Sequence, residues 1–349
     1  MSSRMSVRVG RVTIGGGAPV SVQSMTRTRT KDVSATAGQV KMLAAHGCDI
    51  VRVAVPSISD VQAVAALRDE TRGIPLVADV HYDHRIAVAV TPHVDKIRLN
   101  PGTLQGDDAV ADVVAALKAH GIPLRIGANA GSLPPLLRKD PRPLAERLCD
   151  AAEDLVERFA RHGFTNLVVA VKSNDALETI EASRLAAKRF EHPLHLGVTE
   201  AGTARGGTVR SAVALGVLLA GGVGDTIRVS LAADPLEEVR VGRDVLVALG
   251  LAAPVSRVIA CPTCSRSHMD VMAIATRIEG WVESLPSRVR IAVMGCEVNG
   301  PGEAGDADWA LVGTATGAAL YRQGRVMARG SVDSIEAQLR ANLGKRPPG

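Results

Sequence analysis

The chain has 349 residues, enough for two average domains or for one (β/α)₈ barrel followed by a small module. Hydrophobic residues make up 46% of it, so it can bury a core and global disorder is excluded. Aromatic residues are only 2%, and the formal charge of +5 is dispersed, which disfavours proteins that stack nucleic-acid bases on aromatic rings.

Cysteine usage and hydropathy indicate the compartment. Five unevenly spaced cysteines are too few for a disulfide-stapled secreted domain. The N-terminal residues MSSRMSVRVG hold no apolar signal segment, and no apolar run approaches the ~20 residues that span a bilayer. We therefore expect a cytoplasmic protein with reduced thiols and with neither a nucleic acid nor a membrane as its partner.

Residues 1–18 predict a short hairpin that caps the bottom of a barrel, and eight similar units follow up to about residue 250. Each unit is a β-branched run, a polar loop and an alanine-rich amphipathic stretch. The expected strands cover residues 19–25, 50–55, 75–80, 96–100, 123–129, 166–172, 193–200 and 226–231. Alternating strands and helices pair in parallel, and eight is the number at which such a sheet closes. We predict a TIM barrel over residues 1–252. An open doubly wound sheet is disfavoured because no GxGxxG turn follows the first strand.

The pattern changes near residue 253. Strands are expected at 257–260 and 289–295, a helix at about 269–283, a Gly/Pro-rich loop at 296–308 and a final helix at 332–343. This order predicts a smaller α+β domain over residues 253–345, followed by a disordered tail at 346–349.

Charged and hydrogen-bonding residues stand at the carboxyl ends of the expected strands, where such barrels carry their chemistry. They are the cations Arg52, Arg98, Arg125, Lys172 and Arg228, the neutral Asn100, Asn129, Thr199 and Ser230, the carboxylates Asp79 and Glu200, and His81. Cations gathered this closely repel one another unless a polyanion lies among them, and arginine suits phosphate oxygens. The set predicts a phosphorylated substrate. For each residue alone, capping of a barrel layer is an equal alternative, and Lys172 is also compatible with a Schiff-base aldolase.

Three cysteines fall within the smaller domain. Cys261 and Cys264 form a CxxC after an expected strand, and Cys296 begins the Gly/Pro loop. Three thiolates can hold a zinc ion or an iron–sulfur cluster with one position left for another ligand: His268 for zinc, Glu303 for iron. A zinc-stabilised nucleic-acid-binding protein is therefore an alternative. The remaining cysteines, Cys48 and Cys149, lie on amphipathic stretches and are expected to be buried.

Long motifs of this chain resemble the 4-hydroxy-3-methylbut-2-enyl diphosphate synthase family. CPTCSR (261–266) and GCEVNGPGEA (295–304) resemble its signatures, and SVQSMT, IVRVAVP, PLVADVHYD, IPLRIGANAGSL, PLHLGVTEAG and GDTIRVSLAADP resemble further segments. The resemblance implies a TIM barrel followed by a cluster domain like that of sulfite reductases. It also implies the non-mevalonate isoprenoid reaction, reductive ring opening and dehydration of 2-C-methyl-D-erythritol 2,4-cyclodiphosphate to (E)-4-hydroxy-3-methylbut-2-enyl diphosphate. Two electrons would pass through a [4Fe-4S] cluster from reduced flavodoxin or ferredoxin.

The same resemblance implies roles for individual residues and a head-to-tail homodimer. The cluster ligands fall on Cys261, Cys264, Cys296 and Glu303, and the substrate-site residues on Arg52, Arg98, Arg125, Asn129, Lys172, Thr199, Glu200, Arg228 and Ser230. Glu200 is the expected proton donor for the departing hydroxyl, with Asp79 and His81 as weaker candidates. The loops NPGTLQGDD and SLPPLLRKDPRP depart from the family pattern.

Overall fold

The computed structural model describes residues 3–102, 104, 106–282, 285, 288–298 and 300–343, and in these ranges it leaves out the side chains of residues 132, 303 and 304. Contacts between residues divide the chain into two compact units, residues 1–252 and residues 253–349, which are treated separately below. The tail expected at 346–349 lies outside the described residues.

The first unit is built around eight parallel strands. They are β3 (Ser21–Met25), β4 (Ile50–Ala54), β5 (Leu76–Asp79), β6 (Lys96–Leu99), β7 (Leu124–Asn129), β8 (Leu167–Lys172), β9 (His195–Leu196) and β10 (Thr226–Ile227). Their order is β8-β7-β6-β5-β4-β3-β10-β9, and a bridge between Val169 and Leu194 joins the two ends. The predicted TIM barrel is confirmed, with every strand in the expected place in the chain.

The last two barrel strands are shorter than the sequence pattern suggested. β9 ends before Gly197, whose φ is +154° and whose α-carbon comes so close to the Arg228 carbonyl that an added Cβ would lie 2.2 Å from that oxygen. Only glycine tolerates this backbone and this approach. The regular strand pairing therefore stops there, although the chain continues along the barrel wall.

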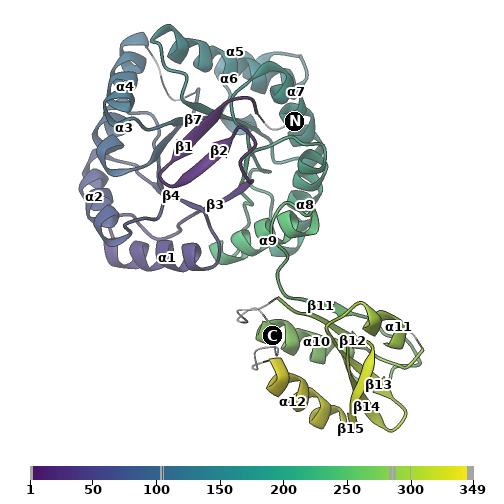
Figure 1. The fold of residues 1–349 in the computed structure, drawn as a ribbon. Helices are drawn as coiled ribbons and strands as arrows, with labels where there is room; N and C mark the ends of the chain where they lie inside the picture. The colour runs from purple at the N-terminus through teal and green to yellow at the C-terminus, as the bar shows by residue number, and fades with distance from the viewer. Residues whose placement is uncertain are drawn as a thin grey trace. The chain divides into compact units, whose positions relative to one another are not determined.

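Nine α-helices of the described chain belong to this unit; eight surround the barrel, as the view along its axis shows (Figure 1), and the short α5 lies at one end. They are α1 (Val33–Ala45), α2 (Val61–Glu70), α3 (His84–Val90), α4 (Asp107–His120), α5 (Pro135–Lys139), α6 (Leu144–Arg161), α7 (Ala176–Arg189), α8 (Ala204–Ala220) and α9 (Pro235–Ala248). Aspartates cap the starts of α1, α3, α7 and α9 by accepting hydrogen bonds from backbone N–H groups. These caps fix where the loops before these four helices end.

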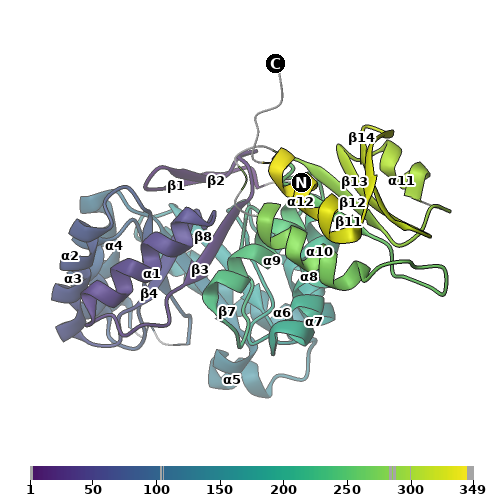
Figure 2. The same ribbon diagram turned by 90° about the horizontal axis from the view of Figure 1, so that it is seen from below.

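A hairpin of β1 (Ser6–Val9) and β2 (Val12–Gly15) lies across the amino end of the barrel. Its Val9 and Ile14 form one buried cluster with Ile50 of β4 and Val77 of β5. Figure 2 shows the hairpin at the opposite end of the barrel from α5, which follows the carboxyl end of β7.

The second unit is a five-stranded mixed sheet with helices. Its elements are β11 (Arg257–Ala260), α10 (Val271–Val282), β12 (Arg290–Met294), α11 (Gly300–Gly305), β13 (Trp309–Thr314), β14 (Gly317–Arg322), β15 (Arg325–Gly330) and α12 (Val332–Leu343). The strands run in sequence order, parallel from β11 to β13 and antiparallel from β13 to β15. The α+β class is as predicted. The expected Gly/Pro loop at 296–308 instead contains the short helix α11. Among the described helices, none has the length and apolarity needed to cross a bilayer.

Candidate functional site

A cavity of about 250 Å³ opens at the carboxyl ends of the barrel strands. Its walls are Arg52, Asp79, His81, Tyr82, Arg98, Asn100, Arg125, Asn129, Lys172, Thr199, Arg228 and Ser230, which we call the cup. Eight of the nine residues that the resemblance assigned to the substrate site are among them, and Glu200 is the exception. Register explains the gathering, because Asp79 is paired with Arg98 on the next strand and Arg98 with Arg125 on the one after. Residues paired in this way point to the same face of a sheet.

Asp79 is held as an anion between two arginines. Arg98 Nη1 donates to Asp79 Oδ1 at 2.9 Å, and Arg52 Nη1 lies 3.7 Å from Oδ2. Burial alone raises the pKa of this carboxyl, but Arg52, His81 and Arg98 outweigh burial, so the pKa of Asp79 lies far below its usual range. Asp79 is therefore a counter-ion of the cup and is not suited to donate a proton near neutral pH.

Glu238 is a second buried carboxylate beside the cup that the sequence did not reveal. It comes from α9, accepts a hydrogen bond from Ser24 Oγ at 2.9 Å, and lies 3.6 Å from Arg228 Nη2. Glu238 is spaced at helical intervals from the buried Gly242 and Val245, so the amphipathic pattern of α9 could have placed it on the inner face of the helix. Asp79 and Glu238 together supply two negative charges against the five cations of the cup.

Arg125 and Lys172 carry the excess positive charge. Arg125 is 3% exposed, and its Nε and Nη1 have no hydrogen-bond partner among the described residues. Lys172 Nζ donates to the Leu196 carbonyl at 3.4 Å. Burial, followed by repulsion from Arg125 and Arg228, lowers the pKa of Lys172 well below its usual value. A guanidinium keeps its proton even so, because its intrinsic pKa is very high. Buried cations in this state favour a bound polyanion.

A further polar layer lies inside the barrel. Lys96 is 0% exposed and donates to Gln23 Oε1 at 3.2 Å, and burial lowers its pKa well below the usual value. His195 is 1% exposed, and neither of its ring nitrogens has a partner in the described part of the chain. Lys96 is two residues before Arg98 on the same strand, so the period of two could have revealed that both side chains face the lumen. Branched apolar side chains usually fill this space.

Glu200, the expected proton donor, is not among the residues that line the cavity. It is exposed and has a left-handed φ of +50°, directly after the lining residue Thr199. Its role in proton transfer remains a prediction. His81 does line the cavity, and its Nε2 lies 2.7 Å from Arg98 Nη1.

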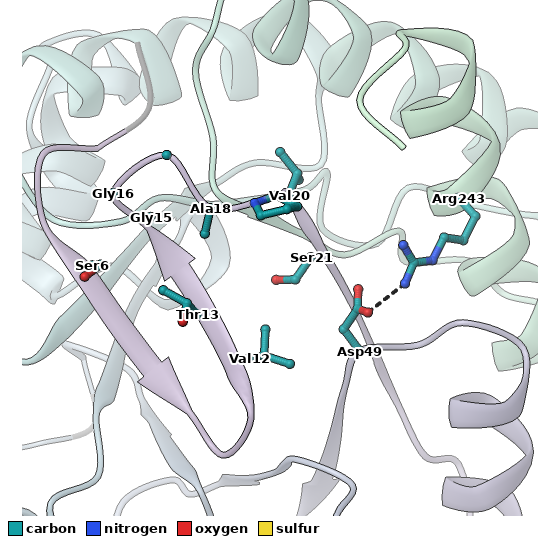
Figure 3. A pocket seen from close by; sticks show the side chains of 12 residues that line it. Ser6, Val12, Thr13, Gly15, Gly16, Ala18, Val20, Ser21, Asp49 and Arg243 are labelled. Atoms are coloured by element: carbon teal, nitrogen blue, oxygen red, sulfur yellow. Dashed lines mark ion pairs between the residues drawn. The ribbon is translucent and has the colours of Figure 1, made fainter. Parts of the chain in front are cut away.

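A wider hollow of about 610 Å³ lies at the other end of the barrel, between the hairpin and the starts of β3 and β4 (Figure 3). There Arg243 of α9 pairs with Asp49 at 2.7 Å, and Asp49 Oδ2 accepts a hydrogen bond from the Val22 N–H at 2.7 Å. Arg243 Nε also donates to the Gly47 carbonyl at 2.7 Å. These contacts tie α9 to the loop before β4, so we assign the ion pair a structural role.

In the second unit, three cysteines face one cavity of about 170 Å³. Cys261, Cys264 and Cys296 line it, and the Gly295 N–H donates to Cys261 Sγ at 3.2 Å. Cys48 and Cys149 are buried in the barrel unit, where burial raises the pKa of each thiol to about 12 and keeps it protonated. The three cysteines of the second unit are therefore the candidate ligands.

The donor set of this cavity fits an iron–sulfur cluster. Among the described residues, no three His, Cys, Asp or Glu side chains converge to hold one metal ion. In a cluster each thiolate binds a different iron, so its ligands surround a volume and need not meet at a point. A backbone N–H donated to a ligating sulfur is also a common feature of such sites.

The fourth ligand has two candidates from the sequence. Glu303 belongs to α11, but its side chain lies outside the described residues, so its role as a ligand stays a prediction. His268 is exposed and is not among the residues that line the cysteine cavity, although its backbone N–H donates to the Gly295 carbonyl at 2.8 Å.

The fold and the two sites define a TIM-barrel protein with a polyanion-binding cup and a smaller α+β unit that carries a three-thiol cavity. Comparison with protein families is more specific. The GcpE TIM-barrel domain matches residues 4–243, and the GcpE protein C-terminal domain matches residues 257–345. The chain belongs to the GcpE family.

Curated relatives share most of the chain's length. A protein of Alcanivorax borkumensis is 47% identical over 97% of this chain and 93% of its own, one of Thermotoga petrophila is 46% identical over 97% of each, and one of Anoxybacillus flavithermus is 42% identical over 99% and 95%. All three are named 4-hydroxy-3-methylbut-2-en-1-yl diphosphate synthase (flavodoxin). Among solved structures, dihydropteroate synthase of Yersinia pestis matches with a TM-score of 0.52 and 15% identity, covering 71% of this chain and 100% of its own, a likeness of the barrel fold alone.

Proposed function

We propose that this protein is an iron–sulfur oxidoreductase that converts 2-C-methyl-D-erythritol 2,4-cyclodiphosphate to (E)-4-hydroxy-3-methylbut-2-enyl diphosphate in isoprenoid precursor biosynthesis. The reaction takes up two electrons, breaks the carbon–oxygen bond that closes the ring, and releases a hydroxyl as water. The observation that carries the proposal is the cup, where five buried or half-buried cations meet two paired carboxylates of the described chain. The names of the relatives identify the diphosphate that the proposed reaction would form.

The cup residues would bind and orient the two phosphates. Arg125 and Lys172 form no ion pair with a carboxylate among the described residues and are the first contacts that we assign, while Arg52 and Arg98 are held in place by Asp79. Such preorganised donors lose little conformational freedom when the substrate binds. Their hydrogen bonds to the diphosphate become stronger as negative charge develops on it during ring opening. Asn129, Thr199, Arg228 and Ser230 would complete the wall around the substrate. Glu200, from its place beside Thr199, would supply a proton to the departing hydroxyl.

The cofactor we propose is a [4Fe-4S] cluster on Cys261, Cys264, Cys296 and Glu303. The cluster supplies electrons one at a time to a substrate that needs two. An oxygen ligand on one iron is more easily exchanged than thiolate, which suits chemistry at that iron and would be useless in a plain electron carrier. Reduced flavodoxin is the proposed donor, with ferredoxin as the alternative, and we propose that the enzyme works in the cytoplasm.

The test uses the full chain purified without oxygen. We expect iron and acid-labile sulfide, a brown colour, and turnover of the cyclodiphosphate with reduced flavodoxin, with the product identified by mass spectrometry. Replacing flavodoxin by ferredoxin in the same assay decides between the donors. A colourless protein with stoichiometric zinc and salt-sensitive RNA binding would support the nucleic-acid alternative. Trapping of Lys172 by borohydride in the presence of substrate would support the aldolase.

The head-to-tail homodimer has a separate test by complementation. Arg125→Met impairs the cup and keeps the thiols, whereas Cys296→Ser keeps the cup and impairs the cluster. In a head-to-tail dimer, a mixture of the two inactive chains forms heterodimers in which one intact cup meets one intact cluster. We expect mixing to restore part of the wild-type rate. A mixture that dimerises, as shown by sedimentation of differently sized tagged chains, yet stays inactive would place each active site within one chain.

A further inference from the structure

Tyr82 differs in kind from the other residues of the cup. Every other lining residue presents a charged group, an amide, an imidazole or a hydroxyl on a short stem, whereas Tyr82 presents a six-membered carbon ring with a hydroxyl at its far end. Tyr82 is 84% exposed although it borders the cavity. Aromatic residues are only 2% of this chain, and it has two tyrosines. An exposed ring at this place therefore calls for an explanation.

The backbone holds the ring of Tyr82 at the mouth of the cup. Its φ is +63°, a left-handed conformation that bulky residues rarely adopt unless their surroundings impose it. Both neighbours are fixed by hydrogen bonds. The Asp83 N–H donates to the His81 carbonyl at 2.8 Å, Asp83 Oδ1 caps α3 by accepting from the Arg85 N–H at 3.0 Å, and His81 Nε2 lies 2.7 Å from Arg98 Nη1.

The chemistry of an organic diphosphate leaves a task that the rest of the cup does not perform. Guanidinium, ammonium and amide groups bind phosphate oxygens, but these polar groups offer little apolar surface to carbon-bound hydrogens. The carbon skeleton of a bound ester would otherwise face charged groups or water at the mouth. The ring of Tyr82 is the apolar surface that the described wall offers at this opening.

We propose that Tyr82 packs its ring against the hydrocarbon part of the bound diphosphate ester and so makes the cup select an organic diphosphate over inorganic pyrophosphate. The identity of the ester rests on the proposed function. The left-handed backbone at Tyr82 then lowers the stability of the fold but places the apolar face of the ring over the polar cup.

The affinity test compares two ligands on the cluster-loaded full chain without an electron donor, so that no turnover occurs. For Tyr82→Ala we expect the affinity for the cyclodiphosphate to fall about tenfold, since most of an aromatic contact is lost, and the affinity for pyrophosphate to stay within about twofold. Tyr82→Phe keeps the ring and should keep both affinities. Tyr82→Gly should raise the melting temperature because glycine relieves the left-handed strain, yet lose the preference for the ester. Leu136→Ala, an exposed residue of α5 outside the cup, is the matched control.

A spectroscopic readout follows the ring itself. With 3-fluorotyrosine incorporated, the chain gives two ¹⁹F signals, and Tyr82→Phe assigns them; the other belongs to Tyr321, which is 5% exposed and lies in the second unit. The cyclodiphosphate should shift the Tyr82 signal and leave the Tyr321 signal in place. An unmoved Tyr82 signal at saturation, or an equal loss of both ligands in Tyr82→Ala, overturns the proposal. If the wild-type chain binds pyrophosphate but not the cyclodiphosphate, the proposed function fails, and methyl diphosphate then serves as the ester in the same comparisons.

Discussion

Removing the positive charge of Arg125 should stabilise the free protein while it weakens anion binding. Arg125→Met keeps the length and apolar stem of the side chain. The guanidinium is buried with two nitrogens unpartnered in the described chain, next to the cations Arg52 and Arg98. An uncompensated buried charge costs several kcal/mol, so the variant should gain about 1–4 kcal/mol in the free energy of unfolding. For a barrel of this size that is ~2–4 °C in melting temperature for each kcal/mol.

The loss in anion affinity can be bounded as well. A unit charge pair at 4 Å is worth about 4 kcal/mol at an effective dielectric constant of ~20. The remaining cations and the desolvation of phosphate reduce this, and hydrogen bonds between charged groups contribute about 1.5–3 kcal/mol in practice. Pyrophosphate should therefore bind about 10- to 150-fold more weakly to Arg125→Met.

The matched control is Arg98→Met, the neighbour of Arg125 in the barrel register. Arg98 donates to Asp79 at 2.9 Å, so its removal leaves that carboxylate with weaker compensation. We expect this variant to be less stable by about 1–3 kcal/mol and also to bind pyrophosphate more weakly. Scanning calorimetry without anions and titration calorimetry with pyrophosphate measure the two effects. If Arg125→Met melts below the wild type, the guanidinium has a partner in solution and the reasoning is refuted.

Three further predictions follow from the charges and thiols. Because the pKa of Asp79 is depressed in the folded state, its carboxylate stabilises that state above the usual carboxyl pKa range, and this stabilisation is lost as the pH falls toward the depressed value. Asp79→Asn should therefore lower the melting temperature at pH 7 by several degrees and make the melting temperature fall less in acid than it does in the wild type. Parallel plots of melting temperature against pH for the two proteins would contradict this. Cys296→Ser should lose most cluster iron, while the buried Cys149→Ser keeps it, as iron and sulfide assays would show; equal iron in both would remove Cys296 from the ligands. Asp49→Asn breaks the ion pair with Arg243 and should cost about 1–3 kcal/mol in urea unfolding while pyrophosphate affinity stays unchanged.

Much of the fold could be predicted from the sequence because its signals are local. Each barrel strand is a β-branched run before a polar loop, and aspartate caps mark helix starts such as those at Asp32 and Asp175. The lining of the cup was predictable for the same reason, since the carboxyl ends of parallel strands meet at one end of a barrel. The short helix α11 was missed because Gly300–Gly305 contains residues that usually break helices.

The unpredicted parts of the site depend on contacts between distant segments. Glu238 reaches the cup from α9, 214 residues after the serine whose hydroxyl it accepts. Glu200 is exposed and has a left-handed backbone, neither of which a strand pattern signals. Tyr82 stood within a recognised motif, yet its place at the mouth depends on neighbours fixed by hydrogen bonds.

The hairpin of β1 and β2 affects how protons reach the interior of the barrel. Because Val9 and Ile14 pack against Ile50 of β4 and Val77 of β5, a layer of hydrocarbon side chains covers the barrel interior at its amino end. Lys96 and His195 inside can then exchange protons with bulk solvent chiefly by way of the cup. A molecule bound in the cup blocks this route, so Lys96 and His195 should keep their protonation states for as long as that molecule stays bound.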